Sequence, residues 1–153
     1  MEGPVSSALA VAAALLSLKS AVTHILAARA RIINKKSFGS NGNLFVPILK
    51  YSVGAFQNWP TPSIEDMERI EKNQAENEPH ILLAIALCAN ANVISPALTI
   101  QLTQVFVASR FLHTTMMLLG SNSGFVKTSI QTASWVPSFL IPTLLGSMVL
   151  AGR

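Results

Sequence analysis

Four long apolar runs dominate this sequence of 153 residues. A helix needs about 20 predominantly apolar residues to cross a hydrocarbon core of ~30 Å, and each run is close to that length or longer. Half of the residues are apolar and only 12% are charged, so the chain is far more apolar than an ordinary soluble domain. The pattern predicts an all-α, four-helix transmembrane bundle. The runs lie at about residues 6–33, 76–94, 97–120 and 126–151.

We interpret residues 1–153 as a single membrane domain. Ser63, followed three residues later by Asp66, is typical of a helix start, so the second helix is predicted over about residues 63–94. Residues 34–62 show no sustained period and are rich in Gly, Asn, Ser and Pro, which indicates a loop. A cleaved signal peptide is the alternative for the first run, but its apolar core is usually 7–15 residues long.

The positive charges follow the predicted membrane edges. Seven Lys and Arg residues lie between residues 29 and 72, whereas the connection at Ser95 and Pro96 has none. The positive-inside rule therefore places the loop of residues 34–62 in the cytoplasm. The net charge of +4 is not gathered into a basic face with interleaved aromatic residues, so we expect no nucleic-acid partner. The single cysteine, Cys88, provides no disulfide framework or metal-ligand spacing, and we expect no metal.

A polar stripe runs along the second predicted helix. Its five side chains fall within an arc of roughly 100° at 100° per residue. Each charge would cost several kcal/mol if it faced lipid, so the stripe is predicted to face other helices, a water-filled cavity or a ligand. The alternative is a set of intrahelical pairs at the cytoplasmic rim. The stripe consists of Arg69, Lys72, Asn73, Glu76 and His80.

The third run carries an arginine near its middle. Arg110 shares one helix face with His113 and Met117. An arginine at that depth indicates a functional site by default, and the alternative is a structural ion pair with Glu76. Both can hold at once, because paired charges can also frame a polar ligand. Lys19 in the first run is expected to have an interhelical partner.

These patterns resemble the signatures of a known family, the membrane-associated proteins in eicosanoid and glutathione metabolism (MAPEG). The family includes microsomal glutathione transferases and microsomal prostaglandin E synthase. Its second-helix signature, approximately R-x-x-x-N-x-x-E-N-x-P, is similar to residues 69–79, and its third-helix signature, R-x-x-H-T, is similar to residues 110–114. In the first helix, Lys19 and Arg31 resemble a lysine that is followed twelve residues later by an arginine. The resemblance covers nearly the whole chain.

The resemblance implies a homotrimer in the endoplasmic reticulum (microsomal) membrane that binds glutathione between neighbouring subunits. Glutathione carries two carboxylates, an ammonium and a thiol. Arginines suit its carboxylates because their planar fork of donors matches that geometry, and the resemblance assigns the ammonium to Glu76. The implied glutathione-binding residues are Arg31, Arg69, Lys72, Asn73, Glu76 and His113.

The activity implied by the resemblance is glutathione transfer to hydrophobic electrophiles from the membrane, together with peroxide reduction by the same thiolate. Lys127 and Thr128 stand where the family has an arginine and a serine that are thought to stabilise the thiolate. These two residues and Arg110 are the expected catalytic residues. Met117 replaces a tyrosine of the prostaglandin synthase and several relatives. Two alternatives therefore stay open, a non-catalytic lipid-binding adaptor and a glutathione-dependent eicosanoid (prostaglandin E) isomerase.

Overall fold

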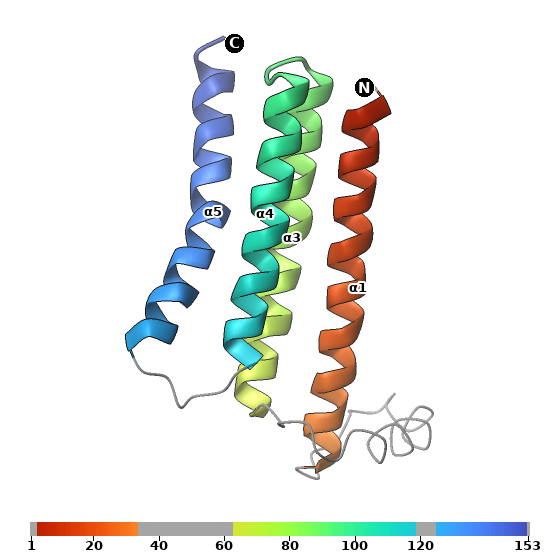
Figure 1. The fold of residues 1–153 in the computed structure, drawn as a ribbon, viewed down its shortest axis with the longest axis vertical. Coiled ribbons are helices and arrows are strands. Elements are labelled where there is room, and N and C mark those ends of the chain that lie inside the picture. Colours follow the sequence, from red (N-terminus) through yellow and green to blue (C-terminus); the bar gives the residue numbers. More distant parts are fainter. Residues whose placement is uncertain (1–2, 34–62, 119–124, 153) are drawn as a thin grey trace.

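The computed structural model describes residues 3–33, 63–118 and 125–152, which form four helices and no strand within these ranges. The helices lie side by side (Figure 1), so the prediction of an all-α, four-helix fold is confirmed. The loop expected at residues 34–62 lies outside the described residues. The helices are α1 (Gly3–Ile33), α3 (Ile64–Asn90), α4 (Pro96–Leu118) and α5 (Phe125–Leu150).

The two ends of α3 follow from local hydrogen bonds. At its start, the Oγ of Ser63 accepts a hydrogen bond from the backbone N–H of Asp66 at 3.0 Å, which is the arrangement of an N-cap. At its other end, α3 stops at Asn90, four residues before the predicted end. The reason is a tight turn in which Asn92 has a φ of 57°, a left-handed conformation that Asn tolerates better than most residues. The backbone N–H of Val93 donates to the Cys88 carbonyl at 2.9 Å and closes this turn.

The central pair of helices is α3 and α4. Each contacts the other and both outer helices, while α1 and α5 make no contact with one another in the described ranges. Figure 1 shows α1 and α5 on opposite sides of this pair, with both chain termini at the end where α3 turns into α4. The outer faces of α1 and α5 carry exposed large apolar side chains, which suit lipid or another apolar surface. They include Leu18, Val22, Phe139 and Leu140.

A buried polar layer separates two apolar clusters of the core. One cluster, on the side of the termini, contains Leu16, Ile85, Phe106 and Leu145. The other contains Ala27, Ala30, Ile64, Met67 and Ile70. All four described helices contribute buried polar side chains between these clusters. We call this set the polar layer: Lys19, Thr23, Gln74, Glu78, Ser109, Arg110, His113, Thr114, Ser134 and Ser138.

Two of the described helical segments are long and apolar enough to cross a membrane by composition, Gly3–Arg31 and Thr128–Leu150. The central helix α3 carries many charged side chains, which lower its mean hydropathy, and α4 carries Arg110 together with several hydroxyl and amide side chains. Four membrane crossings therefore stay a prediction.

Candidate functional site

Glu78 lies at the centre of the polar layer. Its Oε1 pairs with the Nζ of Lys19 on α1 and accepts a hydrogen bond from the Nε of Arg110 on α4 at 3.2 Å. All three residues are buried, with 6% of Glu78, 5% of Lys19 and none of Arg110 exposed. The prediction that Lys19 has an interhelical partner is confirmed. A single carboxylate thus ties three helices together.

Arg110 extends the network from α4 to the two neighbouring helices. Its Nη1 donates to the Oγ of Ser138 on α5 at 3.2 Å, and its Nη2 donates to the Oδ1 of Asn73 on α3 at 3.2 Å. Because the guanidinium is planar, these contacts and the bond to Glu78 fix its orientation. The side chain of Arg110 is therefore buried and held in one orientation inside the bundle.

Asn73 and His113 form the end of this network. The Oδ1 of Asn73 accepts a second hydrogen bond from the Nδ2 of Asn77 at 2.7 Å. On the other side of the amide, the Nδ2 of Asn73 lies 3.1 Å from the Nε2 of His113. The Nδ1 of His113 lies 3.4 Å from the backbone oxygen of Gln131 and 3.4 Å from the Oγ of Ser134, both on α5. The imidazole is therefore held between α3 and α5.

A polar cavity of about 550 Å³ opens where this network reaches the surface. It brings together five of the six residues that the resemblance assigns to glutathione. Two cations, one anion and several amide or imidazole groups therefore meet in one cavity, with an apolar wall formed by Met117 and Trp135. We call it the polar cavity, and it is lined by Arg69, Lys72, Asn73, Glu76, Asn77, His113, Met117, Gln131 and Trp135.

The charged residues at the mouth of the polar cavity are exposed. Lys72 and Glu76 approach to 3.8 Å with 75% and 60% of their side chains exposed. An exposed pair of this kind contributes little to stability, so both charges are available to a ligand.

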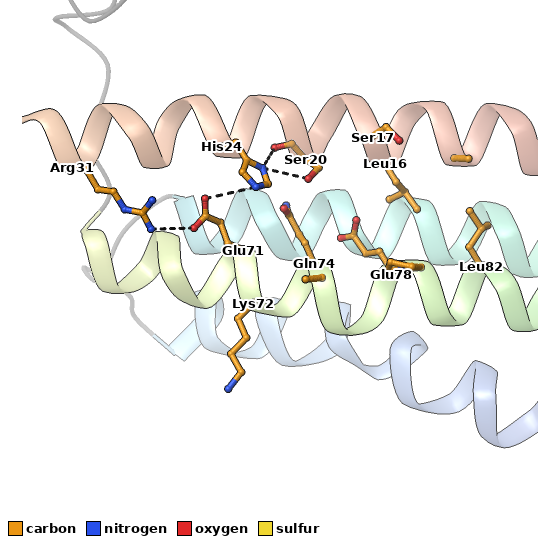
Figure 2. Close-up of a pocket in the computed structure, with 13 residues that line it drawn as sticks. Leu16, Ser17, Ser20, His24, Arg31, Glu71, Lys72, Gln74, Glu78 and Leu82 are labelled. Atoms are coloured by element: carbon orange, nitrogen blue, oxygen red, sulfur yellow. Dashed lines mark hydrogen bonds and ion pairs between the residues drawn. The ribbon is translucent and has the colours of Figure 1, made fainter. Parts of the chain in front are cut away.

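Arg31 lies elsewhere, in a groove of about 730 Å³ between α1 and α3, the α1–α3 groove. Figure 2 shows Glu71 between Arg31 and His24, while Lys72 points away from α1. The Nη2 of Arg31 lies 3.5 Å from the Oε2 of Glu71, and the Nε2 of His24 lies 3.9 Å from its Oε1. In this chain, therefore, Arg31 is not among the residues that line the polar cavity.

The alternative given for Arg110, a structural ion pair with Glu76, is wrong. The partner of Arg110 is Glu78, because residues 76 and 78 are about 200° apart around a helix and only Glu78 faces the bundle interior. Sequence reasoning missed Glu78, although a signal was present. The apolar stripe of Ile70 and Ile81 continues at helical spacing through Gln74 and Glu78, all of which are buried.

The remaining residues that the sequence analysis named lie partly inside and partly outside the polar cavity. Thr128 is exposed in the first turn of α5, and the side chain of Lys127 lies outside the described part of the structure. His80, the last member of the predicted stripe, is exposed and is not among the residues that line the polar cavity. Met117 lines the cavity, and its Sδ accepts a hydrogen bond from the Nε2 of Gln131.

Comparison with known proteins gives one match. Residues 9–147 match the MAPEG family, a range that includes the polar layer and every residue that lines the polar cavity. No curated protein matches the chain, and no solved structure matches it.

Proposed function

The chain belongs to the MAPEG family, and from this membership we propose that it is a membrane-bound glutathione transferase. It would conjugate glutathione to hydrophobic electrophiles that dissolve in the bilayer. The observation that carries this proposal is the polar cavity, which gathers Arg69, Lys72 and Glu76 beside Asn73 and His113.

The charges of the polar cavity complement those of glutathione. At neutral pH the tripeptide carries two carboxylates and one ammonium, and the cavity offers Arg69 and Lys72 as cations and Glu76 as the anion. The amide groups of Asn73 and Asn77 supply hydrogen bonds for the peptide. A volume of about 550 Å³ falls within the usual range for small-molecule sites.

We propose that Lys127 and Thr128 act on the thiol. A free thiol with a pKa of about 8.5 is only a few per cent ionised at neutral pH. An ammonium and a hydroxyl at the start of α5 would favour the thiolate, with help from the positive end of the helix. The thiolate sulfur then attacks the electrophilic carbon, a carbon–sulfur bond forms, and the leaving group departs with its electron pair. No protein nucleophile is required.

We expect bound glutathione to show the ultraviolet absorption band of a thiolate, and Lys127→Ala to reduce that band. The physical reason is the loss of a positive charge that favours the ionised sulfur. The measurement is a difference spectrum of glutathione with the purified protein, followed by a conjugation assay with an aromatic halide. An unchanged band in Lys127→Ala would transfer the activating role to another cation. A missing band together with no turnover would favour the lipid-binding adaptor.

We also propose a homotrimer that crosses the endoplasmic reticulum membrane several times. The outward mouth of the polar cavity and the position of Arg31 in the α1–α3 groove support assembly, because Arg31 would reach a cavity of this kind only from a neighbouring subunit. We expect mass measurement in mild detergent to give three copies. A protein that is only monomeric under these conditions contradicts the assembly.

The isomerase and adaptor alternatives rest on Met117. A thioether cannot donate the hydrogen bond that a tyrosine hydroxyl offers, and Met117 lines the cavity beside His113. If the ultraviolet band is present but aromatic halides are not conjugated, a glutathione-dependent isomerase becomes the better description.

A further inference from the structure

We propose that Glu78 is a positioning residue for the polar cavity. It holds Arg110 so that Asn73 presents its amide N–H groups, and not its oxygen, toward His113 and the cavity. Neither Glu78 nor Arg110 is among the residues that line this cavity. The expected effect on glutathione rests on the proposed function, whereas the effect on His113 does not.

The first step is the orientation of Arg110. Its Nε donates to Glu78 and its Nη1 donates to Ser138, each at 3.2 Å. These contacts lie on different sides of a rigid planar group, so the Nη2 has little freedom of direction. It donates to the Oδ1 of Asn73 at 3.2 Å. The carboxylate of Glu78 is the only anion among these acceptors and therefore provides the strongest bond.

The second step is the orientation of the Asn73 amide. Its Oδ1 accepts from both Arg110 and Asn77. An amide nitrogen in that position would face two donors, so the assignment of oxygen and nitrogen follows from the network. The Nδ2 of Asn73 must then be the group that faces the Nε2 of His113 at 3.1 Å.

The third step is the tautomer of His113. Because Asn73 donates, the Nε2 of His113 accepts, and the ring proton lies on Nδ1. That Nδ1 faces the backbone oxygen of Gln131 at 3.4 Å, which can only accept. The Oγ of Ser134 lies at the same distance and donates its own proton to the Gln131 oxygen at 2.8 Å. Each hydrogen bond from Arg110 through Asn73 and His113 to Gln131 thus runs in one direction, with each group donating to the next or accepting from the one before.

This direction decides what the cavity offers to a ligand. An Asn side chain has two amide N–H groups, so after one donates to His113 the other is left for a ligand oxygen. If Arg110 were released, the amide could rotate and present its oxygen instead. An acceptor in that position is unfavourable beside the carboxylates of glutathione. Glu78 therefore acts on the ligand through Arg110 and Asn73.

The test compares two variants that differ only at Glu78. Lys19→Met keeps the pair between Glu78 and Arg110, and Lys19→Met/Glu78→Met removes it while filling the space with an apolar side chain of similar length. The double substitution replaces the Lys19–Glu78 pair by apolar side chains but leaves the guanidinium of Arg110 buried without its carboxylate partner. A loss of stability is therefore expected, and circular dichroism checks that the variant folds. Lys19→Met/Glu78→Gln, which keeps a neutral acceptor, is the conservative variant and the substitute if the methionine pair does not fold.

The first measurement is the nitrogen NMR spectrum of histidine-labelled protein without glutathione, with the His113 signal identified by its loss in His113→Gln. We expect Lys19→Met to keep the wild-type signal of a ring protonated at Nδ1. The Lys19→Met/Glu78→Met variant should show a mixture of tautomers, and Lys19→Met/Glu78→Gln a smaller change. An identical signal in all variants overturns the inference, as does an equal change in Lys19→Met.

The second measurement is the Kd for glutathione. We expect Lys19→Met/Glu78→Met to bind about tenfold more weakly than Lys19→Met, as for the loss of one hydrogen bond to a charged group. Equal affinities in the two variants would overturn the effect on the ligand. If the wild-type protein does not bind glutathione at all, the proposed function fails, and the NMR result still decides the role of Glu78.

Discussion

Replacement of Glu78 by alanine is expected to lower the free energy of unfolding by about 3–5 kcal/mol, the usual effect of removing one partner from a buried ion pair. Glu78 is the carboxylate that faces both Lys19 and Arg110. Without it, two buried cations lie in the bundle interior with no counter-charge from α3. The measurement is reversible unfolding in mixed micelles followed by circular dichroism.

Glu76→Ala is the matched control, because it removes the same side chain two residues earlier in the same helix. Glu76 is 60% exposed and its partner Lys72 is 75% exposed, so we expect a change of at most about 0.5 kcal/mol. Lys19→Ala and Arg110→Ala each leave Glu78 paired with one remaining cation, so that the two charges balance. On charge alone they should destabilise less than Glu78→Ala. Equal stabilities of Glu76→Ala and Glu78→Ala would contradict the assignment of the buried carboxylate.

The helices were predictable because their signals are local. Long apolar runs predict helices, and the hydroxyl of Ser63 placed before Asp66 predicts the start of α3 that the structure shows. The end of α3 was not predictable to the residue. It depends on the left-handed backbone of Asn92, a conformation that the residue type permits but does not require.

The polar stripe was predictable for a similar reason. Spacings of three and four residues place Arg69, Asn73 and Glu76 on one helix face, and these residues do line one cavity. Helix periodicity does not show which neighbouring helix that face meets. Glu76 and Glu78 are equally charged in the sequence, and the spacing of Glu78 from Ile70 and Ile81 is the sequence signal that places it on the buried face. Its partners on α1 and α4 follow only from the packing of the helices.

Arg31 shows the same limit. Its charge and its place in the first run indicate the membrane edge, but they do not show which side of α3 it reaches. The structure places it in the α1–α3 groove with Glu71 (Figure 2). Within one chain, Arg31 therefore lies in the α1–α3 groove, apart from the other residues attributed to glutathione, which line the polar cavity, and Lys72 borders both. The division is a consequence of tertiary packing and has no signature in the local sequence.

Replacement of Glu76 by glutamine is expected to weaken glutathione binding about 10- to 100-fold, because it removes the one anion among the described residues that line the polar cavity. The size of the side chain and one acceptor oxygen are kept. Loss of a hydrogen bond to a charged group amounts to about 1.5–3 kcal/mol, and each 1.4 kcal/mol is tenfold in Kd. The measurement is titration calorimetry in detergent. Because Glu76 is exposed, the variant should fold with wild-type stability, which the unfolding assay described above checks.

A second ligand separates the charge of Glu76 from its other properties. N-Acetylated glutathione keeps both carboxylates and the thiol but has no ammonium. If Glu76 receives the ammonium, wild-type protein should bind this ligand about as weakly as Glu76→Gln binds glutathione, and the substitution should have little further effect on it. The two changes would then be non-additive, as expected for groups in direct contact. Arg69→Gln removes a cation that is proposed to bind a carboxylate of glutathione. Because both ligands keep their carboxylates, this substitution should weaken both by the same factor. If Glu76→Gln weakens both ligands equally, Glu76 does not receive the ammonium, and glutathione must bind in another orientation.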